Sequence, residues 1–208
     1  MCGLLDRHFQ NVTRERFESD LAEKEWVLLL YQAEVLEGFS TLMRLETGPV
    51  VAFFSGDTIV SAEARSRLDL PRLWGRHVFG LAQELAPREV YWFLICSGYR
   101  TYRFLPTFFR EFFPRFDQPT PPATARLLDG LCRQKFPHGY EPATGVVRLE
   151  HPAPLKEELA EIPARRMRDP HVAFYARANP GYARGDELAC IVRVCRANLT
   201  PAGLRMLE

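Results

Sequence analysis

Residues 97–103, Ser-Gly-Tyr-Arg-Thr-Tyr-Arg, form the densest group of polar side chains beside an apolar run. Arg100 and Arg103 suit the oxygens of a phosphate or a carboxylate, because a guanidinium can donate two parallel hydrogen bonds to them. Ser97 or Thr101 can cap a following helix and leave backbone amides free for an anion. The alternative is that the arginines are solvated and the tyrosines anchor a turn. Both interpretations remain open, and Ser97 and Arg100 are candidate ligand-binding residues.

Asp57 is a second candidate, because it stands inside the apolar run Val50–Val60 (VVAFFSGDTIV). A lone carboxylate in an apolar environment is costly, so Asp57 must be paired or exposed. As a general base it would remove a proton from an amine. The alternative is an aspartate at a bulge or turn that bonds nearby amides, and the neighbouring Gly56 is typical of a bulge.

Histidines and cysteines do not indicate a metal site. The five histidines show neither HxxxH nor HxH spacing, and no two of the five cysteines form a CxxC pair. An odd number of cysteines in mostly apolar runs favours buried, reduced thiols and a cytoplasmic location.

Composition excludes some classes of partner. The chain has 208 residues and a net charge of +1, so no overall field attracts nucleic acid or an anionic membrane. We find no apolar signal region, and no apolar run approaches the roughly 20 residues that span a bilayer. We therefore expect a small-molecule ligand as the partner.

Hydrophobic periodicity and turn residues predict the elements that position these candidates. The first half is predicted to contain a helix at 13–24, a meander of strands Trp26–Gln32, Gly38–Leu45 and Val50–Val60, a loop Ser61–Asp69, a helix ending at Pro87, the buried strand Val90–Ser97 and an aromatic helix running to Phe113. Glu37-Gly38 and Thr47-Gly48-Pro49 are predicted turns. The second half is predicted to contain a proline-rich boundary Phe116–Pro122, a helix at about Ala123–Phe136, strands Val146–Leu149, Val172–Ala176 and Glu187–Cys195, and a last helix from Thr200.

This order of elements resembles the GNAT superfamily of N-acetyltransferases over about residues 13–115. The resemblance implies an α/β fold, with a mixed, mainly antiparallel sheet flanked by helices. It divides the chain into a core at 1–118 and an elaboration at 119–208, whose late strands complete the same sheet in one compact domain. It also implies acetyl-CoA or a longer acyl-CoA as co-substrate.

The family's pyrophosphate-binding loop has the pattern Arg/Gln-x-x-Gly-x-Gly/Ala, and Arg72-Leu73-Trp74-Gly75-Arg76-His77 matches its arginine and first glycine. The resemblance therefore implies that Arg72, Gly75 and Arg76 bind coenzyme A. His77 stands where the family has a small residue.

In the family, a tyrosine of the helix after the central strand protonates the leaving thiolate. This chain has phenylalanines in that helix, and Tyr99 and Tyr102 are the nearest phenols. Tyr102 is the candidate acid, the alternative being a reaction without a side-chain acid, and Asp57 is the candidate base. The leading hypothesis is an acyltransferase acting on an unknown amine. The alternative is a catalytically degenerate member that binds a ligand or a protein. The phenylalanine-rich helix suits either core packing or a homodimer interface.

Overall fold

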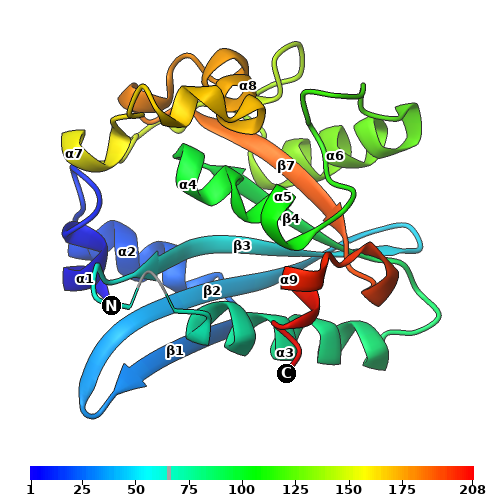
Figure 1. Ribbon diagram of the computed structural model, residues 1–208, viewed down its shortest axis with the longest axis horizontal. Helices are drawn as coiled ribbons and strands as arrows, with labels where there is room; N and C mark the ends of the chain where they lie inside the picture. The colour runs from blue at the N-terminus through cyan, green and yellow to red at the C-terminus, as the bar shows by residue number, and fades with distance from the viewer. Residues whose placement is uncertain (65–66) are drawn as a thin grey trace.

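The computed structural model describes residues 1–64 and 67–208. Within these ranges, seven strands form one sheet in the order β1-β2-β3-β4-β7-β6-β5, and helices cover both of its faces (Figure 1). Across the described strands, β3 and β4 run parallel and the other neighbours are antiparallel. The expected α/β architecture with a mixed, mainly antiparallel sheet is confirmed.

The bounds of the elements are as follows. The strands are β1 (Trp26–Gln32), β2 (Val35–Thr47), β3 (Val50–Val60), β4 (Val90–Cys96), β5 (Tyr140–Glu141), β6 (Val146–Val147) and β7 (Glu187–Arg193). The helices are α1 (Cys2–Asp6), α2 (Arg14–Ala22), α3 (Asp69–Glu84), α4 (Tyr99–Tyr102), α5 (Phe104–Phe108), α6 (Pro122–Lys135), α7 (Glu157–Ala160), α8 (Pro170–Ala178) and α9 (Pro201–Leu204).

The meander of β1, β2 and β3 forms as expected, but its first turn lies elsewhere. The chain turns at Ala33, which has a positive φ of 52°, and β2 already begins at Val35. Gly38 is not in this turn but pairs with Leu30 and Val60 inside the sheet. A side chain there would meet the Ile59 carbonyl oxygen at 2.8 Å, so the glycine permits close packing of the strands.

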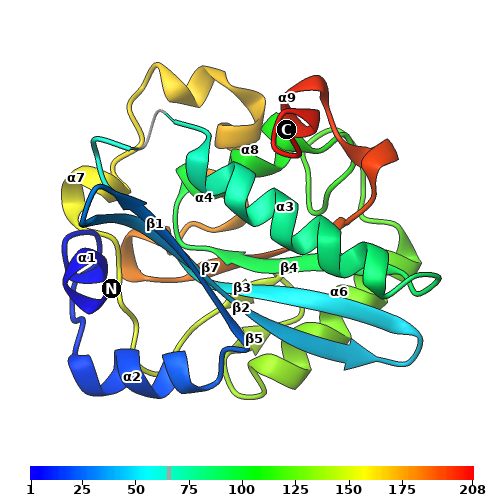
Figure 2. The same cartoon turned by 90° about the horizontal axis from the view of Figure 1, so that it is seen from below.

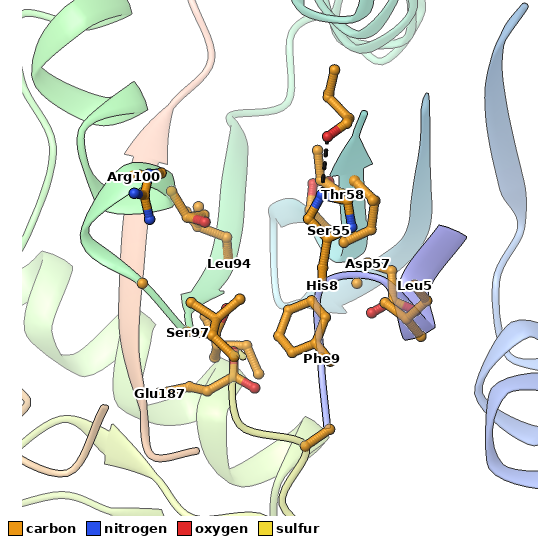
Figure 3. Close-up of a pocket in the computed structure, with 18 of the residues that line it drawn as sticks. Leu5, His8, Phe9, Ser55, Asp57, Thr58, Leu94, Ser97, Arg100 and Glu187 are labelled. Atoms are coloured by element: carbon orange, nitrogen blue, oxygen red, sulfur yellow. Dashed lines mark hydrogen bonds between the residues drawn. The ribbon is translucent and has the colours of Figure 1, made fainter. Parts of the chain in front are cut away.

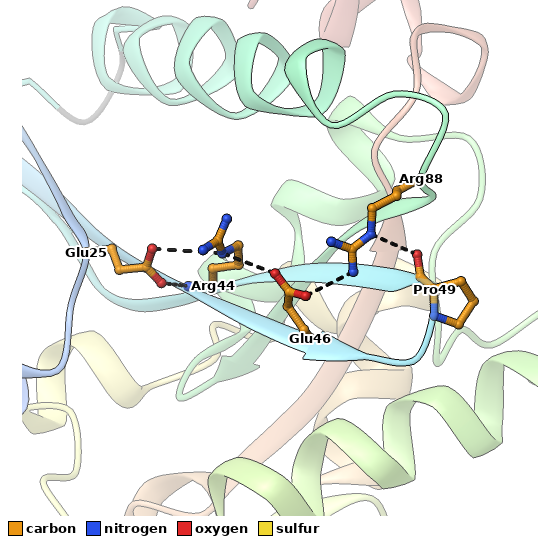
Figure 4. Close-up of polar contacts among 5 residues, drawn as sticks. All are labelled: Glu25, Arg44, Glu46, Pro49 and Arg88. Atoms are coloured by element: carbon orange, nitrogen blue, oxygen red, sulfur yellow. Dashed lines mark hydrogen bonds and ion pairs between the residues drawn. The ribbon is translucent and has the colours of Figure 1, made fainter.

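An ion-pair network holds the far end of the β2–β3 hairpin to the entry of β4 (Figure 4). Arg88 donates to the Pro49 carbonyl and to Glu46 at 3.1 Å, and Arg44 lies between Glu46 and Glu25. The hydrogen bond from Arg88 lowers the pKa of Glu46. All these side chains are solvated, so we attribute little stability to each pair.

The aromatic segment after β4 was expected to form one helix to Phe113, but it is broken into shorter pieces. It forms the single turn α4 and the short helix α5, with Pro106 in the first turn of α5. Phe109 and Phe113 then adopt bridges to Leu199 and Ile191. The last turn ends because the chain becomes extended at Phe109 to pair with these late segments.

Segment 172–176 is helical, so the predicted strand is wrong there. The Asp169 side chain accepts a hydrogen bond from the His171 amide, and Pro170 occupies the first position of α8. Val172 and Tyr175, three residues apart, are fully buried against the sheet. An N-cap followed by proline is a helix start, and this local signal outweighed the β-branched and aromatic residues.

Two layers of helices bury the sheet (Figure 2). Helices α3, α4, α5 and α8 pack on one face, around Trp74, Trp92 and Tyr175. Helix α6 packs on the other face through Leu131 and Cys132. Helices α1 and α2 cover that same side near β2 and β3.

Of the helices in the described ranges, none is long and apolar enough to cross a membrane. The expected loop Ser61–Asp69 is only partly described, because 65–66 lie outside the described residues.

Candidate functional site

The parallel strands β3 and β4 separate halfway along their length. Their pairing runs from Val51 opposite Val90 to Ser55 opposite Leu94. Beyond that point β3 continues to Val60, while β4 ends at Cys96 and turns into α4. Trp92 Nε1 donates a hydrogen bond to Ser55 Oγ at 2.8 Å, at the last paired position. The gap between the separated strands is therefore bordered by backbone from both.

A cavity of about 600 Å³ fills this gap (Figure 3). Its walls come from both strand ends, the first residues of α3, the segment around α1 and α2, and residues 149–159. Most of the lining is apolar, with contributions from Phe9, Leu94, Phe108 and Leu155. A cavity of this size and polarity is typical of a small-molecule site.

Asp57 lies in this cavity because a bulge interrupts β3. The β2–β3 register shifts between Ser40 and Leu42, so Gly56 and Asp57 stand at the expected bulge. Burial and then the nearby charge of Asp20 raise the pKa of Asp57 to about 6, although Lys24 partly opposes the shift. Within the described chain, no side chain or amide hydrogen-bonds to its carboxylate. The carboxylate thus faces the cavity unpaired.

Glu187, the first residue of β7, is a second carboxylate in the same cavity. Its backbone pairs with Val147 of β6. Burial raises the pKa of Glu187 to about 8, and the charge of Asp57 adds to this effect. The sequence analysis did not single out Glu187. The available signal was an acidic residue at the start of an apolar strand, which is too common to identify a site.

The Lys24 side chain packs against the bulge at Gly56. Its side chain is fully buried, and its Nζ forms an ion pair with Asp20 at 2.6 Å. A side chain on Gly56 would meet Lys24 Cε at 2.6 Å and Thr41 Oγ1 at 2.7 Å. Glycine at this position therefore lets the chain pass close to the ion pair and turn Asp57 into the cavity.

The structure brings Ser97 and Arg100 to the cavity, opposite β3. The Arg100 guanidinium donates to the Leu159 carbonyl and stacks on the Tyr99 ring, 4.8 Å from its centroid. Arg103 instead pairs with Asp169 at 3.2 Å. Of the two arginines in this segment, only Arg100 is therefore placed to meet a ligand.

Tyr102 does not line the cavity. Its side chain is fully buried among Phe112, Phe174 and Tyr175, and its hydroxyl donates to the Pro114 carbonyl at 2.8 Å. Burial raises the pKa of Tyr102 above that of a free phenol. The structure therefore does not bring Tyr102 together with Asp57.

Arg72, Gly75 and Arg76 face segment 205–208 rather than the cavity. Arg72 donates to the Arg205 carbonyl, and Arg76 donates to the backbone oxygen of Glu208. A side chain on Gly75 would meet both Met206 Cβ and the Met206 carbonyl oxygen at 3.0 Å. The part of α3 that does reach the cavity is its beginning, at Leu70, Pro71 and Trp74.

No group of three or more possible metal-ligating side chains was found among the described residues. No protein-family model and no curated protein sequence matches this chain.

Proposed function

We propose that the protein transfers an acyl group from a coenzyme A thioester to an amine. The observation that carries this proposal is the separation of β3 and β4 around a cavity in which Asp57 faces an apolar lining. The cavity offers room for the acyl end of the thioester and for an acceptor. The sheet topology is also compatible with the N-acetyltransferase resemblance, in which a thioester arm enters between two such strands.

The chemistry requires a base for the amine. The amine nitrogen attacks the thioester carbonyl carbon, the C–N bond forms and the C–S bond breaks. The ammonium form of the amine first gives a proton to Asp57, which frees the nitrogen lone pair for this attack. The nitrogen loses its second proton to water as the amide forms, and the thiolate takes a proton from water and leaves as the thiol. A base with a pKa of about 6 is ionised at neutral pH and still basic enough to accept this proton.

Binding of the thioester would use the beginning of α3 and the end of β4. Among the described residues, no side chain caps the start of α3, so the amides of Asp69 and Leu70 are available to an anion, whereas Pro71 has no N–H. Arg100 and Ser97 line the same cavity from β4 and α4. These groups replace Arg72, Gly75 and Arg76 in our proposal, because segment 205–208 covers that face of the helix.

The test is a titration of the purified protein with acetyl-, octanoyl- and palmitoyl-coenzyme A, followed by melting temperature. We expect a saturable rise, which for a ligand at 100 times its Kd corresponds to about 2.7 kcal/mol. Asp57→Asn should keep this binding and lower turnover by about 100-fold or more, while the exposed control Asp6→Asn should leave both binding and turnover unchanged. No rise at millimolar concentrations of any thioester would contradict the proposal.

A ligand-binding module without catalysis is the second candidate. It is favoured by the position of Tyr102, which leaves the cavity without a phenol acid. For this candidate, the same titration should give a rise in melting temperature, and no wild-type turnover should be found with any amine.

A further inference from the structure

We propose that Asp57 and Glu187 together form the binding site for a cationic amine with an apolar body. The role of this amine as the acyl acceptor rests on the proposed function, whereas its binding can be tested without any thioester. The two carboxylates belong to residues 130 positions apart in the sequence, and β3 and β7 bring them to the same cavity (Figure 3).

Neither the Asp57 carboxylate nor the Glu187 carboxylate has a partner among the described residues. In the part of the chain that the structure describes, neither one takes part in an ion pair or accepts a hydrogen bond through its side chain. Unpaired carboxylates with restricted access to water are costly, and natural proteins usually compensate them with a cation or a hydrogen-bond donor. A ligand that carries such a group would supply the missing compensation.

Most of the cationic side chains near the cavity already have a partner. Lys24 pairs with Asp20, Lys135 pairs with Glu23, and Arg100 bonds to the Leu159 carbonyl. Arg67 donates to Gln32. The other charged or titratable side chains that line the cavity are Arg16, which is exposed at the start of α2, His151, and His8, whose ring nitrogens lie within hydrogen-bond distance of the Leu4 and Val60 carbonyl oxygens.

The negative charge that Asp57 and Glu187 carry together depends on pH. With a pKa of about 6 for Asp57 and about 8 for Glu187, the pair carries close to one negative charge at pH 7. The charge increases to two above pH 8 and disappears below pH 5. An ammonium group keeps its charge over this whole range, because an alkyl amine has a pKa of about 10. Cation binding should therefore strengthen as the pH rises from 5 to 9.

The rest of the cavity wall is mostly apolar. Phe9, Leu94, Phe108 and Leu155 line the cavity, and they favour an aliphatic or aromatic body over a polar one. An apolar pocket with two carboxylates in its wall orients such a ligand with its ammonium toward them.

The experiment compares 2-phenylethylamine with 2-phenylethanol, which has the same shape without the charge. Calorimetric titration of the full chain at pH 8.5 should show that the amine binds at least about tenfold more tightly than the alcohol. The ratio of the two affinities, amine over alcohol, should fall toward one at pH 5. Glu187→Gln and Asp57→Asn should each weaken amine binding by about tenfold and leave alcohol binding unchanged. The control is Glu141→Gln, the same change at an exposed position of β5.

Equal affinities for the amine and the alcohol would overturn the inference, as would a preference that survives in Glu187→Gln. Melting curves establish that each variant is folded, and two independent variants guard against a local defect in one. An amine preference in a protein that binds no acyl-coenzyme A would support the amine site and reject the transferase. Thioester binding without an amine preference would reject the amine site and leave the transferase in place.

Discussion

Tyr102 and Asp57 show how a single side chain acquires or loses a chemical role. Both are polar residues beside apolar runs, and the sequence predicts a site near each. Asp57 reaches the cavity because a bulge turns it there, whereas Tyr102 points into the core and bonds to the Pro114 carbonyl. A phenol can satisfy its hydroxyl inside a protein with one acceptor, but a carboxylate without a partner must face a polar ligand or water.

We expect Tyr102→Phe to lower the free energy of unfolding by about 1–2 kcal/mol, because the buried Pro114 carbonyl loses its donor. Turnover of any acyl-transfer activity should remain within about twofold of wild type. Chemical denaturation and a steady-state assay measure the two effects. A strong loss of turnover at unchanged stability would instead place the phenol in the reaction.

At the level of elements, α3 carries out two structural tasks with two of its faces. One face packs Trp74 and Val78 on the sheet, and another receives segment 205–208 at Gly75. The Arg-x-x-Gly pattern in this helix predicts an anion site, but the same residues can equally hold a peptide segment. A guanidinium can donate to backbone carbonyls as well as to phosphates, so the pattern alone cannot distinguish the two uses.

Gly75→Ala and Gly80→Ala form a matched pair that tests the packing of this helix. A side chain on Gly80 meets nothing within 4 Å, so Gly80→Ala should stabilise the protein by about 0.5–1 kcal/mol through helix propensity. Gly75→Ala brings the same gain, but its methyl group would press on Met206 at 3.0 Å, and we expect the net effect to be zero or destabilising. Thermal unfolding gives both values, and equal stabilisation by both variants would show that segment 205–208 does not pack there.

At the level of the whole molecule, the sheet joins the two halves of the chain at its centre. Strand β7, from the second half, pairs with β4 along six residue pairs. This pairing places Glu187 in the cavity that β3 and β4 open, so the candidate site requires both halves. The charge of Asp57 then adds to the rise in the pKa of Glu187, although the two residues are far apart in sequence.

The free energy of unfolding should depend on pH through this pair. Folding raises the pKa of Glu187 from an ordinary value near 4.3 to about 8 and that of Asp57 to about 6, so the folded state binds more protons between these values. Protonation of Glu187 and Asp57 therefore stabilises the folded state at low pH, and this contribution is lost as the pH rises to 8. We expect Glu187→Gln to be more stable than wild type at pH 8, by on the order of 1–3 kcal/mol, and close to wild type at pH 5.

Urea denaturation of wild type and Glu187→Gln at the two pH values measures this difference, with Glu141→Gln as the exposed control. Titrating groups that do not interact with Glu187 cancel in the comparison, because they are common to both proteins. A stability difference that is the same at pH 5 and pH 8 would show that Glu187 has an ordinary pKa.

The sequence by itself determined the α/β class, the bounds of β1 and β3, the presence of α2, the bulge at Gly56, and Asp57, Ser97 and Arg100 as candidates. These follow from local periodicity, capping and turn chemistry, which act over a few residues. The tertiary structure decided that Tyr102 is buried, that segment 205–208 covers Arg72, Gly75 and Arg76, and that Glu187 joins Asp57. Those outcomes depend on which distant segments pack together. Side-chain direction at the ends of α4 and β7 is set by that packing, and no local pattern encodes it.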